Sequence, residues 1–219
     1  MMQTRGRPRS FDREQALHVA MQVFWNKGYE GTTMADLTAA IGVKAPSLYA
    51  AFGDKNALFR EAVDCYAATA GAAPLAALKG GQGIRADLSN MLRASVAMFD
   101  DPANGKGCMV VMSAINCAPE NLAHSDELTI RRQKKRTELE KRLAQAQEQN
   151  ELRADADIKG LSDFYIGVLH GLSLGSRDGV SSERMYKIID YAMQVLDAEM
   201  RPASANRETT TFPDSQSKA

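Results

Sequence analysis

Apolar residues recur at intervals of three and four along most of the chain, which is the spacing of a helix that buries one face. The first stripe runs from Ala16 to Phe24 and ends before Lys27 and Gly28. Comparable stripes, separated by Gly, Pro and Asp, predict helices over about 12–27, 33–41, 55–70, 84–99, 125–151, 158–176 and 182–200. The pattern therefore predicts an all-α fold.

Residues 33 to 55 predict two short helices joined by a glycine turn. Thr33 can cap the first helix, and Asp36, three residues later, can complete a capping box. Gly42 can adopt the left-handed conformation that ends a helix, and Pro46 suits the start of the second helix. A turn this short brings the second helix round at a steep angle, which is typical of a helix-turn-helix that binds the DNA major groove.

The second of these helices should present a narrow face to solvent, because Leu48 would pack back against the first helix. The outward face consists of Lys44, Ala45, Ser47, Tyr49, Ala50 and Ala51. Lys44 and Ser47 are the best candidates for contacts with base edges. Since three of these side chains are alanines, thymine-methyl contacts and DNA shape should carry much of the specificity.

This part of the chain resembles the tetracycline-repressor (TetR) family of bacterial transcriptional regulators. The resemblance rests on Ala20 to Gly31, Thr32-Thr33, Ile41-Gly42-Val43, Ser47-Leu48-Tyr49, Phe52 and Lys55. It implies that Tyr49 and Lys55 contact DNA phosphates, with Thr33 as a further donor. The chain departs from the commoner family pattern at Ala51, where an aromatic residue or His is frequent, and at Lys44, where a small capping Ser is frequent.

The resemblance also implies a three-helix DNA-binding domain followed by a helical domain that binds a ligand and dimerises. We expect a basic arm over 1–9, a DNA-binding domain over 10–55, an effector-binding and dimerisation domain over 56–201, and a disordered tail over 202–219. Arg5, Arg7 and Arg9 of the arm suit a narrow minor groove or the phosphates beside it. A solvated tail is the alternative interpretation of the arm.

The composition is that of a folded protein whose positive charge is concentrated near the N-terminus. The 219 residues are 44% hydrophobic with a net charge of zero, but residues 1–60 hold eight Lys or Arg against five acids, a net charge of +3. A local excess of this kind favours phosphate contact. The three cysteines have no disulfide framework, and no apolar run reaches the ~18 residues of a membrane span, so we expect a cytoplasmic protein.

The last two predicted helices are candidates for a dimer interface. Glycines recur every four residues on one face of the first, and each costs a helix about 1 kcal/mol relative to Ala, which a closely approaching partner helix would offset. A palindromic operator also requires a two-fold dimer. The residues assigned to this interface are Gly167, Gly171, Gly175, Ile188, Ile189, Ala192 and Leu196.

The segment between Ile84 and Leu172 is expected to enclose an apolar cavity for a small effector. Its methionines are flexible linings, although they serve equally well as core filling. The expected lining residues are Met91, Met98, Cys108, Met109, Met112, Asn116, Tyr165 and His170, and His124 is a further polar candidate. We expect a Gly- and Ala-rich break over 71–83 and a buried helix over 108–117.

Other functions fit the sequence less well. Cys108 and Cys117 could sense an oxidant or electrophile, and with nearby methionines they could bind Cu(I), although most buried cysteines are inert. An enzyme would need a nucleophile elbow, a phosphate-binding loop or an HExxH motif, and none of them occurs. No cofactor is predicted. A helical scaffold that does not bind DNA would leave the basic arm and residues 33–55 unexplained.

Overall fold

The computed structural model describes residues 12–201, so the predicted basic arm with Arg5, Arg7 and Arg9 and the predicted tail lie outside the described residues. Within this range the regular secondary structure is helical, and the β structure is limited to one isolated bridge between Leu152 and Met200, which confirms the all-α prediction. The elements are α1 (Arg13–Lys27), α2 (Met34–Ile41), α3 (Ala45–Phe52), α4 (Lys55–Ala68), α5 (Ala72–Leu78), α6 (Ile84–Asp100), α7 (Met109–Met112), the 3-10 turn η1 (Pro119–Asn121), α8 (Leu122–Glu148), α9 (Ile158–Arg177) and α10 (Ser182–Glu199).

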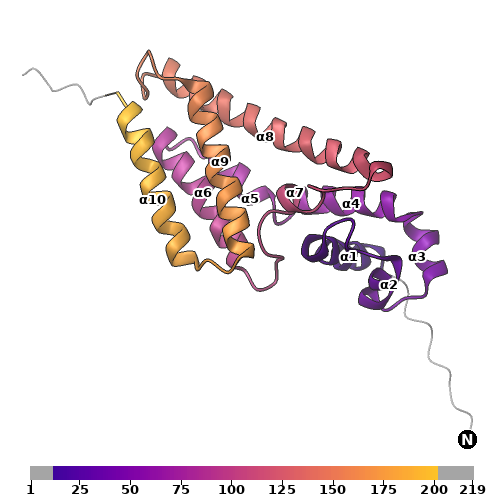
Figure 1. The fold of residues 1–219 in the computed structure, drawn as a ribbon. Helices are drawn as coiled ribbons and strands as arrows, with labels where there is room; N and C mark the ends of the chain where they lie inside the picture. The colour runs from indigo at the N-terminus through magenta and orange to yellow at the C-terminus, as the bar shows by residue number, and fades with distance from the viewer. Residues whose placement is uncertain (1–11, 202–219) are drawn as a thin grey trace, which may run out of the picture.

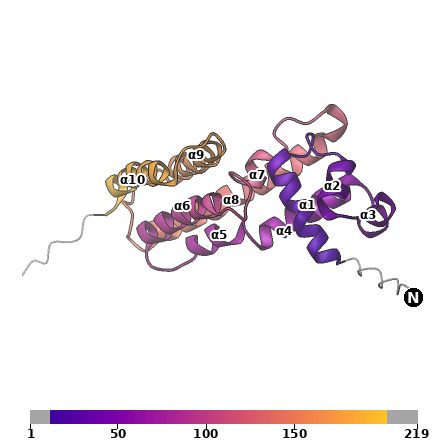
Figure 2. The same cartoon turned by 90° about the horizontal axis from the view of Figure 1, so that it is seen from below.

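The helices form two groups. Helices α1 to α3 lie together at one end, and α5, α6, α9 and α10 lie at the other, with α4 and α8 extending between them (Figure 1). Seen from below, α9 and α10 form an outer layer beside α6 (Figure 2). Among residues 12–201, no helix has the length and apolar character needed to cross a membrane.

Most of the longer helices begin at a side chain that accepts a backbone N–H. Asp12, Asp54 and Asp157 do so for the N–H groups of residues 15, 57 and 160, at 3.0, 2.8 and 3.0 Å. Ser181 caps α10 in the same way. Caps of this kind stabilise a helix by ~1 kcal/mol each and fix where it starts, which is why these boundaries follow from local sequence.

One continuous core joins the two groups of helices. Phe24 of α1 packs edge-to-face on Phe59 of α4, with ring centroids 5.1 Å apart. Trp25, which is fully buried, packs on Tyr66 of α4 and donates its indole N–H to the carbonyl of Gly107 at 2.8 Å. Helix α1 is therefore fixed both to α4 and to the loop before α7.

The expected break over 71–83 is wrong in part, because residues 72–78 form α5 against α6. Four of its seven residues are alanines, which favour helix, and Leu78 is buried in the core. Pro74 lies in the first turn, where a helix needs no N–H from the residue.

The helix expected over 108–117 is also wrong, because only residues 109–112 form a helical turn. The backbone of this segment bonds to other elements instead. The Cys108 N–H donates to the Ser173 hydroxyl at 2.8 Å, and the Ser113 carbonyl accepts the Tyr29 N–H at 2.7 Å. These tertiary hydrogen bonds replace those that a longer helix would make.

Candidate nucleic-acid interface and internal cavity

Helices α2 and α3 form the predicted helix-turn-helix. The Thr33 hydroxyl accepts the Asp36 N–H at 3.1 Å, and the Asp36 carboxylate accepts the Thr33 N–H at 2.8 Å, which is the predicted capping box. Gly42 ends α2 with φ 77° and ψ 31°, in the left-handed region, where a side chain would be strained. Pro46 lies in the first turn of α3 as predicted. Local sequence alone thus fixes the geometry of this unit.

Helix α3 presents most of its predicted outward face to solvent. Leu48 is fully buried on the inner side, whereas Tyr49 has 49% of its surface exposed. Tyr49 is therefore not a core aromatic residue. Lys44, Ala45, Ser47 and Ala50 are exposed, while Ala51 is half-buried against the core and so departs from the prediction.

Thr33 is less available to a phosphate than predicted. Its hydroxyl donates to the Asp36 carboxylate at 2.7 Å, and the same carboxylate pairs with Lys27 at 2.6 Å. The hydrogen bonds from Lys27 and Thr33 hold the pKa of Asp36 well below its usual range, so Asp36 is ionised. Thr33 therefore acts first as a helix cap.

Lys55 is the first residue of α4, but its ammonium group lies over the ring of Tyr29, 4.1 Å from the centroid. Burial lowers the pKa of Lys55, and the nearby carboxylate of Glu30 acts in the opposite direction. A contact between Lys55 and a phosphate would therefore require the side chain to leave Tyr29. The cation–π contact that it would lose contributes ~0.5–2 kcal/mol.

A polar cluster that the sequence did not predict surrounds this lysine. The Tyr29 hydroxyl donates to the side-chain oxygen of Asn56, and that oxygen lies 3.0 Å from His124 Nε2. One Glu30 oxygen accepts the side-chain amide of Asn121 at 2.9 Å. Because Asn121 and His124 lie at the start of α8, the cluster ties α4 and the α1–α2 loop to the long helix. No periodic pattern marks these residues, since they meet only in the folded chain.

The predicted dimer surface is exposed only in part. Gly167 and Gly171 lie on the exposed side of α9, with open space where a side chain would begin, and Ile188 of α10 is exposed beside them in the same layer. Gly175 faces Val180 of its own chain. The exposed large apolar residues of this outer layer are Phe164, Leu174, Ile188, Tyr191 and Val195.

Three assignments to that surface are wrong. Ile189, Ala192 and Leu196 are buried within the chain, on the side of α10 that faces α6 and α9. The apolar stripe of α10 thus belongs to the internal core, and a partner would contact the residues beside it.

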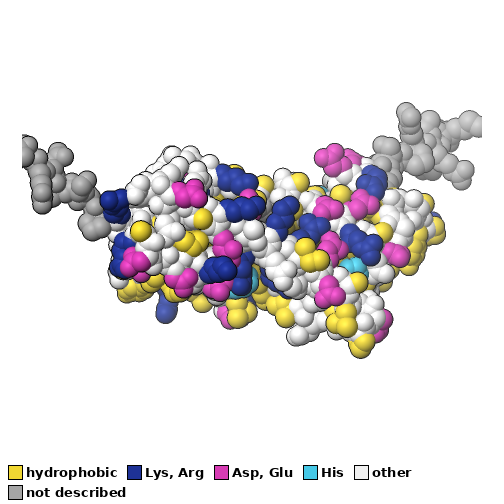
Figure 3. All heavy atoms as spheres, turned by 90° about the horizontal axis from the view of Figure 1, so that it is seen from above, with side chains coloured by type: hydrophobic (Ala, Val, Ile, Leu, Met, Phe, Trp, Pro, Cys, Tyr) yellow, Lys and Arg dark blue, Asp and Glu magenta, His cyan; other side chains and the backbone are white. Residues whose placement is uncertain are grey.

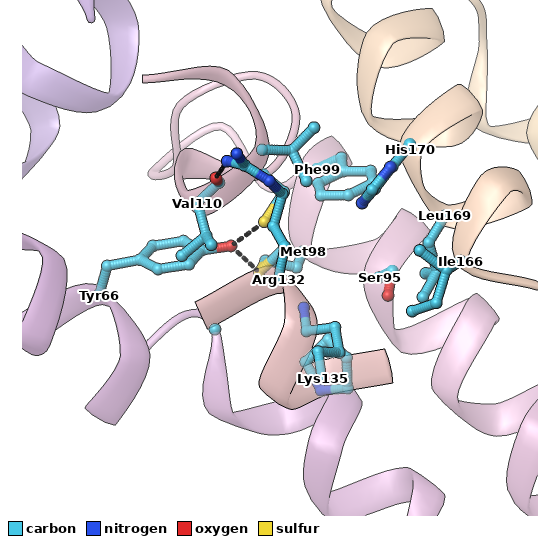
Figure 4. A pocket seen from close by; sticks show the side chains of 14 residues that line it. Tyr66, Ser95, Met98, Phe99, Val110, Arg132, Lys135, Ile166, Leu169 and His170 are labelled. Atoms are coloured by element: carbon cyan, nitrogen blue, oxygen red, sulfur yellow. Dashed lines mark hydrogen bonds between the residues drawn. The ribbon is translucent and has the colours of Figure 1, made fainter. Parts of the chain in front are cut away.

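A small cavity lies where α4, α6, α8 and α9 meet the segment before α8 (Figure 4). Its volume is about 20 Å³, and it adjoins an open groove of about 540 Å³ between α5 and α8. We call these the inner cavity and the outer groove. The inner cavity is lined by Tyr66, Gly71, Pro74, Ser95, Met98, Phe99, Cys108, Val110, Val111, Arg132, Lys135, Ile166, Leu169 and His170.

Of the residues expected to line an effector cavity, three line the inner cavity: Met98, Cys108 and His170. The remaining assignments are wrong for this cavity. Met91 and Met109 are buried in the core, and Tyr165 is buried with its hydroxyl donating to the Ala192 carbonyl at 2.9 Å. Asn116 is exposed, Met112 is half-buried, and neither lines the cavity. His124 belongs to the polar cluster at Lys55.

The cavity holds polar groups that the sequence did not predict. The Tyr66 hydroxyl, which is nearly fully buried, donates to Cys108 Sγ at 3.3 Å and Met98 Sδ at 3.6 Å, and its oxygen also interacts with the backbone N–H of Met109. Burial raises the pKa of Tyr66 well above its usual value, so the phenol stays protonated. Arg132 donates to the carbonyl of Val110 at 2.8 Å beside Tyr66 (Figure 4).

The cysteines do not form a pair at this cavity. Cys108 lines it, whereas Cys117 lies half-buried near Glu30 and Lys55, where burial raises the pKa of its thiol. A raised pKa reduces the thiolate fraction and so the reactivity of Cys117. Within residues 12–201, no cluster of three or more His, Cys, Asp and Glu side chains has the arrangement of a metal site.

Comparison with known proteins agrees with this geometry. The family model for bacterial regulatory proteins of the tetR family matches residues 16–62, and the model for the tetracyclin repressor-like C-terminal domain matches residues 80–192. The HTH-type transcriptional repressor ComR of Escherichia coli K12 is 33% identical over 186 residues, which cover 84% of this chain and 89% of ComR. The HTH-type transcriptional repressor BdcR of the same strain is 30% identical over 192 residues, covering 82% of this chain and 86% of BdcR.

A solved structure resembles the whole described fold. It is a cysteine mutant of the TetR family transcriptional regulator CifR in complex with a 26-bp double-stranded operator DNA. It has a TM-score of 0.82 and 39% identity, and the match covers 86% of this chain and 98% of CifR. These relatives are transcriptional regulators, which confirms the prediction that the chain is not an enzyme. The chain therefore belongs to the TetR family of bacterial transcriptional regulators.

Proposed function

We propose that this chain is a homodimeric repressor that binds a palindromic operator and is released from it by a small effector. The observation that carries the proposal is the exposed face of α3 with Lys44, Ser47 and Tyr49 on a capped helix-turn-helix. A helix this short and narrow fits the major groove, and the exposed side chain of Tyr49 can reach a phosphate beside the groove.

Dimerisation is supported by the outer layer of α9 and α10. Monomeric proteins seldom expose several large apolar side chains on neighbouring helices, because water contact with such a patch is unfavourable. Tyr191 is 69% exposed and Leu174 is 49% exposed, and the bare surfaces at Gly167 and Gly171 allow a second copy of α9 to approach closely. A symmetric dimer would place two α3 helices on successive half-sites of a palindrome.

Effector release is supported by the course of α4. Lys55 at its start lies at the proposed DNA end, and Tyr66 near its other end lines the inner cavity. The two residues are about 16 Å apart along the axis, at 1.5 Å per residue. A ligand that displaces Tyr66 would move a rigid helix that carries Lys55. We accordingly propose that residues 10–55 bind DNA and that residues 56–201 bind the effector and dimerise.

A thiol-based response is the second candidate function, and the position of Cys108 favours it. Its sulfur lies in the inner cavity beside the Tyr66 hydroxyl, so an adduct there would displace α4 as a ligand would. Treatment with an alkylating electrophile should then release DNA from the wild type and from Cys117→Ser but not from Cys108→Ser. Equal release from all three proteins would exclude this function.

The proposed function is tested by gel shift with duplex DNA from the region upstream of the chain's own gene. We expect the wild type to shift this DNA in the presence of excess unrelated DNA. A Ser47→Arg, Tyr49→Ala double variant should lose the shift, because it changes the exposed face of α3 without touching Leu48. A matched control, Gln133→Ala on the exposed side of α8, should bind as the wild type does. Equal binding by the double variant would contradict the assignment of α3.

A further inference from the structure

The basic residues of α8 fall into two sets. Arg131, Arg136, Lys141 and Arg142 each have a carboxylate within 4 Å, from Asp64, Asp163, Glu138 and Asp87 respectively. Arg132, Lys134 and Lys135 make no such pair among the described residues. Lys134 and Lys135 line the outer groove, and Arg132 and Lys135 line the inner cavity. Figure 3 shows Lys and Arg side chains along the face that carries α8, with acidic side chains between them.

The lining of the inner cavity contains no carboxylate that could neutralise Arg132 and Lys135. Its lining includes Arg132, Lys135 and His170 but neither Asp nor Glu. Burial lowers the pKa of His170, and repulsion from Arg132, Lys135 and Arg136 lowers it further. Burial also lowers the pKa of Arg132, with only the Cys108 thiol acting against it. The cavity is thus a site of uncompensated positive charge, and such charge favours an anion.

The Tyr66 hydroxyl provides a second, independent indication. It is buried, it points into the inner cavity, and the acceptors of its proton are the sulfur atoms of Met98 and Cys108 (Figure 4). Sulfur is a weak acceptor, so a carboxylate oxygen in the cavity would form a much stronger hydrogen bond with this phenol.

The two volumes indicate which end of a ligand binds where. The inner cavity of about 20 Å³ has room for about one water molecule, so it can admit a small charged group only after Tyr66 or Val110 shifts slightly. The outer groove of about 540 Å³ shares Tyr66, Val110 and Lys135 with the inner cavity. Its α5 side is mostly apolar and includes Leu75, and its α8 side carries Arg131, Lys134, Lys135 and Glu138. A volume of this size accommodates the body of a small organic molecule.

We propose that the effector of this regulator is an organic carboxylate with an apolar body. Its carboxylate lies in the inner cavity between Arg132 and Lys135 and accepts a hydrogen bond from Tyr66, and its apolar body lies in the outer groove along α5. This inference rests on the proposed effector-released function and specifies the chemistry of the ligand. Entry of the carboxylate displaces Tyr66 and so moves α4.

Trp25 provides a direct readout of binding. It is the single tryptophan of the chain, it packs on Tyr66 with ring centroids 4.7 Å apart, and it bonds to Gly107 beside Cys108. The probes are sodium octanoate and octanamide, which share an apolar body and differ in charge, together with inorganic phosphate. Each probe is titrated into the wild-type protein at pH 7.5, and the change in Trp25 fluorescence gives its affinity. Octanoate should bind at least about tenfold more tightly than octanamide, and phosphate should leave the fluorescence unchanged.

Substitutions locate the charge. Arg132→Gln should weaken the binding of octanoate about 10- to 100-fold, because it removes a charged hydrogen bond, and should leave the binding of octanamide unchanged. Arg132→Lys should retain part of the preference, which separates loss of charge from misfolding. Lys159→Gln, at an exposed position of α9, removes the same charge and should change neither affinity. Equal affinity for octanoate and octanamide, binding of phosphate as tight as that of octanoate, or an unchanged octanoate affinity in Arg132→Gln would overturn the inference.

A gel shift with the same probes separates this inference from the proposed function. Release of operator DNA by octanoate but not octanamide supports both. Release by both probes with equal potency overturns the carboxylate inference and leaves the effector-released repressor intact. Tight binding of octanoate without any release of DNA would support the carboxylate-binding site but contradict the proposed release of DNA by an effector.

Discussion

At the scale of single residues, Lys55 links the proposed DNA contact to the interior of the protein. It packs on Tyr29 in this structure, yet it occupies the first turn of α4, where free N–H groups and the helix dipole also attract a phosphate oxygen. The free energy lost with the Tyr29 contact is small compared with the free energy gained from a phosphate contact at low salt. We therefore expect Lys55 to exchange Tyr29 for phosphate when DNA binds.

Lys55→Gln tests this exchange. Operator affinity should fall, and the slope of log K against log salt concentration should become less steep by about 0.9, the value for one phosphate contact. Fluorescence anisotropy with labelled operator over a range of NaCl concentrations measures both. Lys159→Gln, with the same loss of charge at an exposed position, should leave the slope unchanged. An unchanged slope in Lys55→Gln would remove this residue from the interface.

His124 makes the stability of the protein depend on pH. Burial lowers its pKa, and Arg60 and Lys55 lower it further against the weaker opposing effects of Glu127 and Glu30. Its Nδ1 atom has no hydrogen-bond partner among the described residues, so added charge there would be buried without compensation. The unfolded chain then binds this proton more readily than the folded protein does, and stability falls as the pH drops below about 6.5.

The measurement is thermal unfolding between pH 7.5 and pH 5.5. The midpoint should fall over this range, and the fall should be smaller in His124→Gln. The midpoint of His124→Gln should still fall to some extent, because His170 also has a lowered pKa. His18→Gln, at an exposed position of α1, is the matched control and should behave as the wild type does. A His124→Gln variant with the full wild-type fall would refute this assignment.

At the scale of elements, α6 and α8 are held together by a buried ion pair. Asp87 of α6 is fully buried and accepts from Arg142 of α8 at 2.9 Å, and it also accepts the N–H groups of Gly81 and Gln82. Asp87→Ala should cost ~3–5 kcal/mol, because the largely buried guanidinium group keeps only the longer contact to Glu151 at 3.6 Å and the N–H groups of Gly81 and Gln82 lose their acceptor. Urea unfolding measures the loss.

An exposed pair between α6 and α10 serves as the control. Asp197 of α10 pairs with Arg85 of α6 at 2.6 Å, with both side chains about half exposed. Asp197→Ala should cost only ~0–1 kcal/mol, since solvent screens the pair. Similar losses in the two variants would mean that the burial of Asp87 contributes nothing to stability.

The outer surface of α9 and α10 is tested by Gly171→Leu. A side chain at this position has open space within the protomer, so the variant should keep its helicity. In a close helix–helix interface the added bulk costs about 1–3 kcal/mol, which weakens dimerisation by roughly 5- to 150-fold. Sedimentation equilibrium measures the dimer, and Gln133→Leu on α8 is the control. An undiminished dimer in Gly171→Leu would place the interface elsewhere.

The sequence predicts those elements whose causes are local. Asp12 and Thr33 fix the starts of α1 and α2 through their side chains, and Gly42 ends α2 through its left-handed backbone, so these boundaries were predicted correctly. The 108–117 segment could not be predicted, because its backbone bonds to Tyr29 and Ser173, which are remote in sequence. Periodicity likewise identified the apolar stripe of α10 at Ile189 but could not show whether that stripe faces the core or a partner.

At the scale of the whole molecule, α4 connects the two activities proposed here. It carries Lys55 at one end and Tyr66 at the other, and α1 is tied to the same region through Trp25 and Gly107. A ligand can release DNA only if it binds the free form more tightly than the DNA-bound form, and the two affinities must change by the same factor. The effector should therefore bind the operator complex more weakly than it binds the free dimer.

The proposed dimeric repressor is tested most directly by the number of chains that bind one operator. Sedimentation velocity with a labelled duplex from the upstream region measures this for the wild type and for Gly171→Leu at equal concentrations. We expect two wild-type chains on each palindromic site and little or no complex with Gly171→Leu. A stable complex that contains a single chain, or equal binding by both proteins, would contradict this proposal.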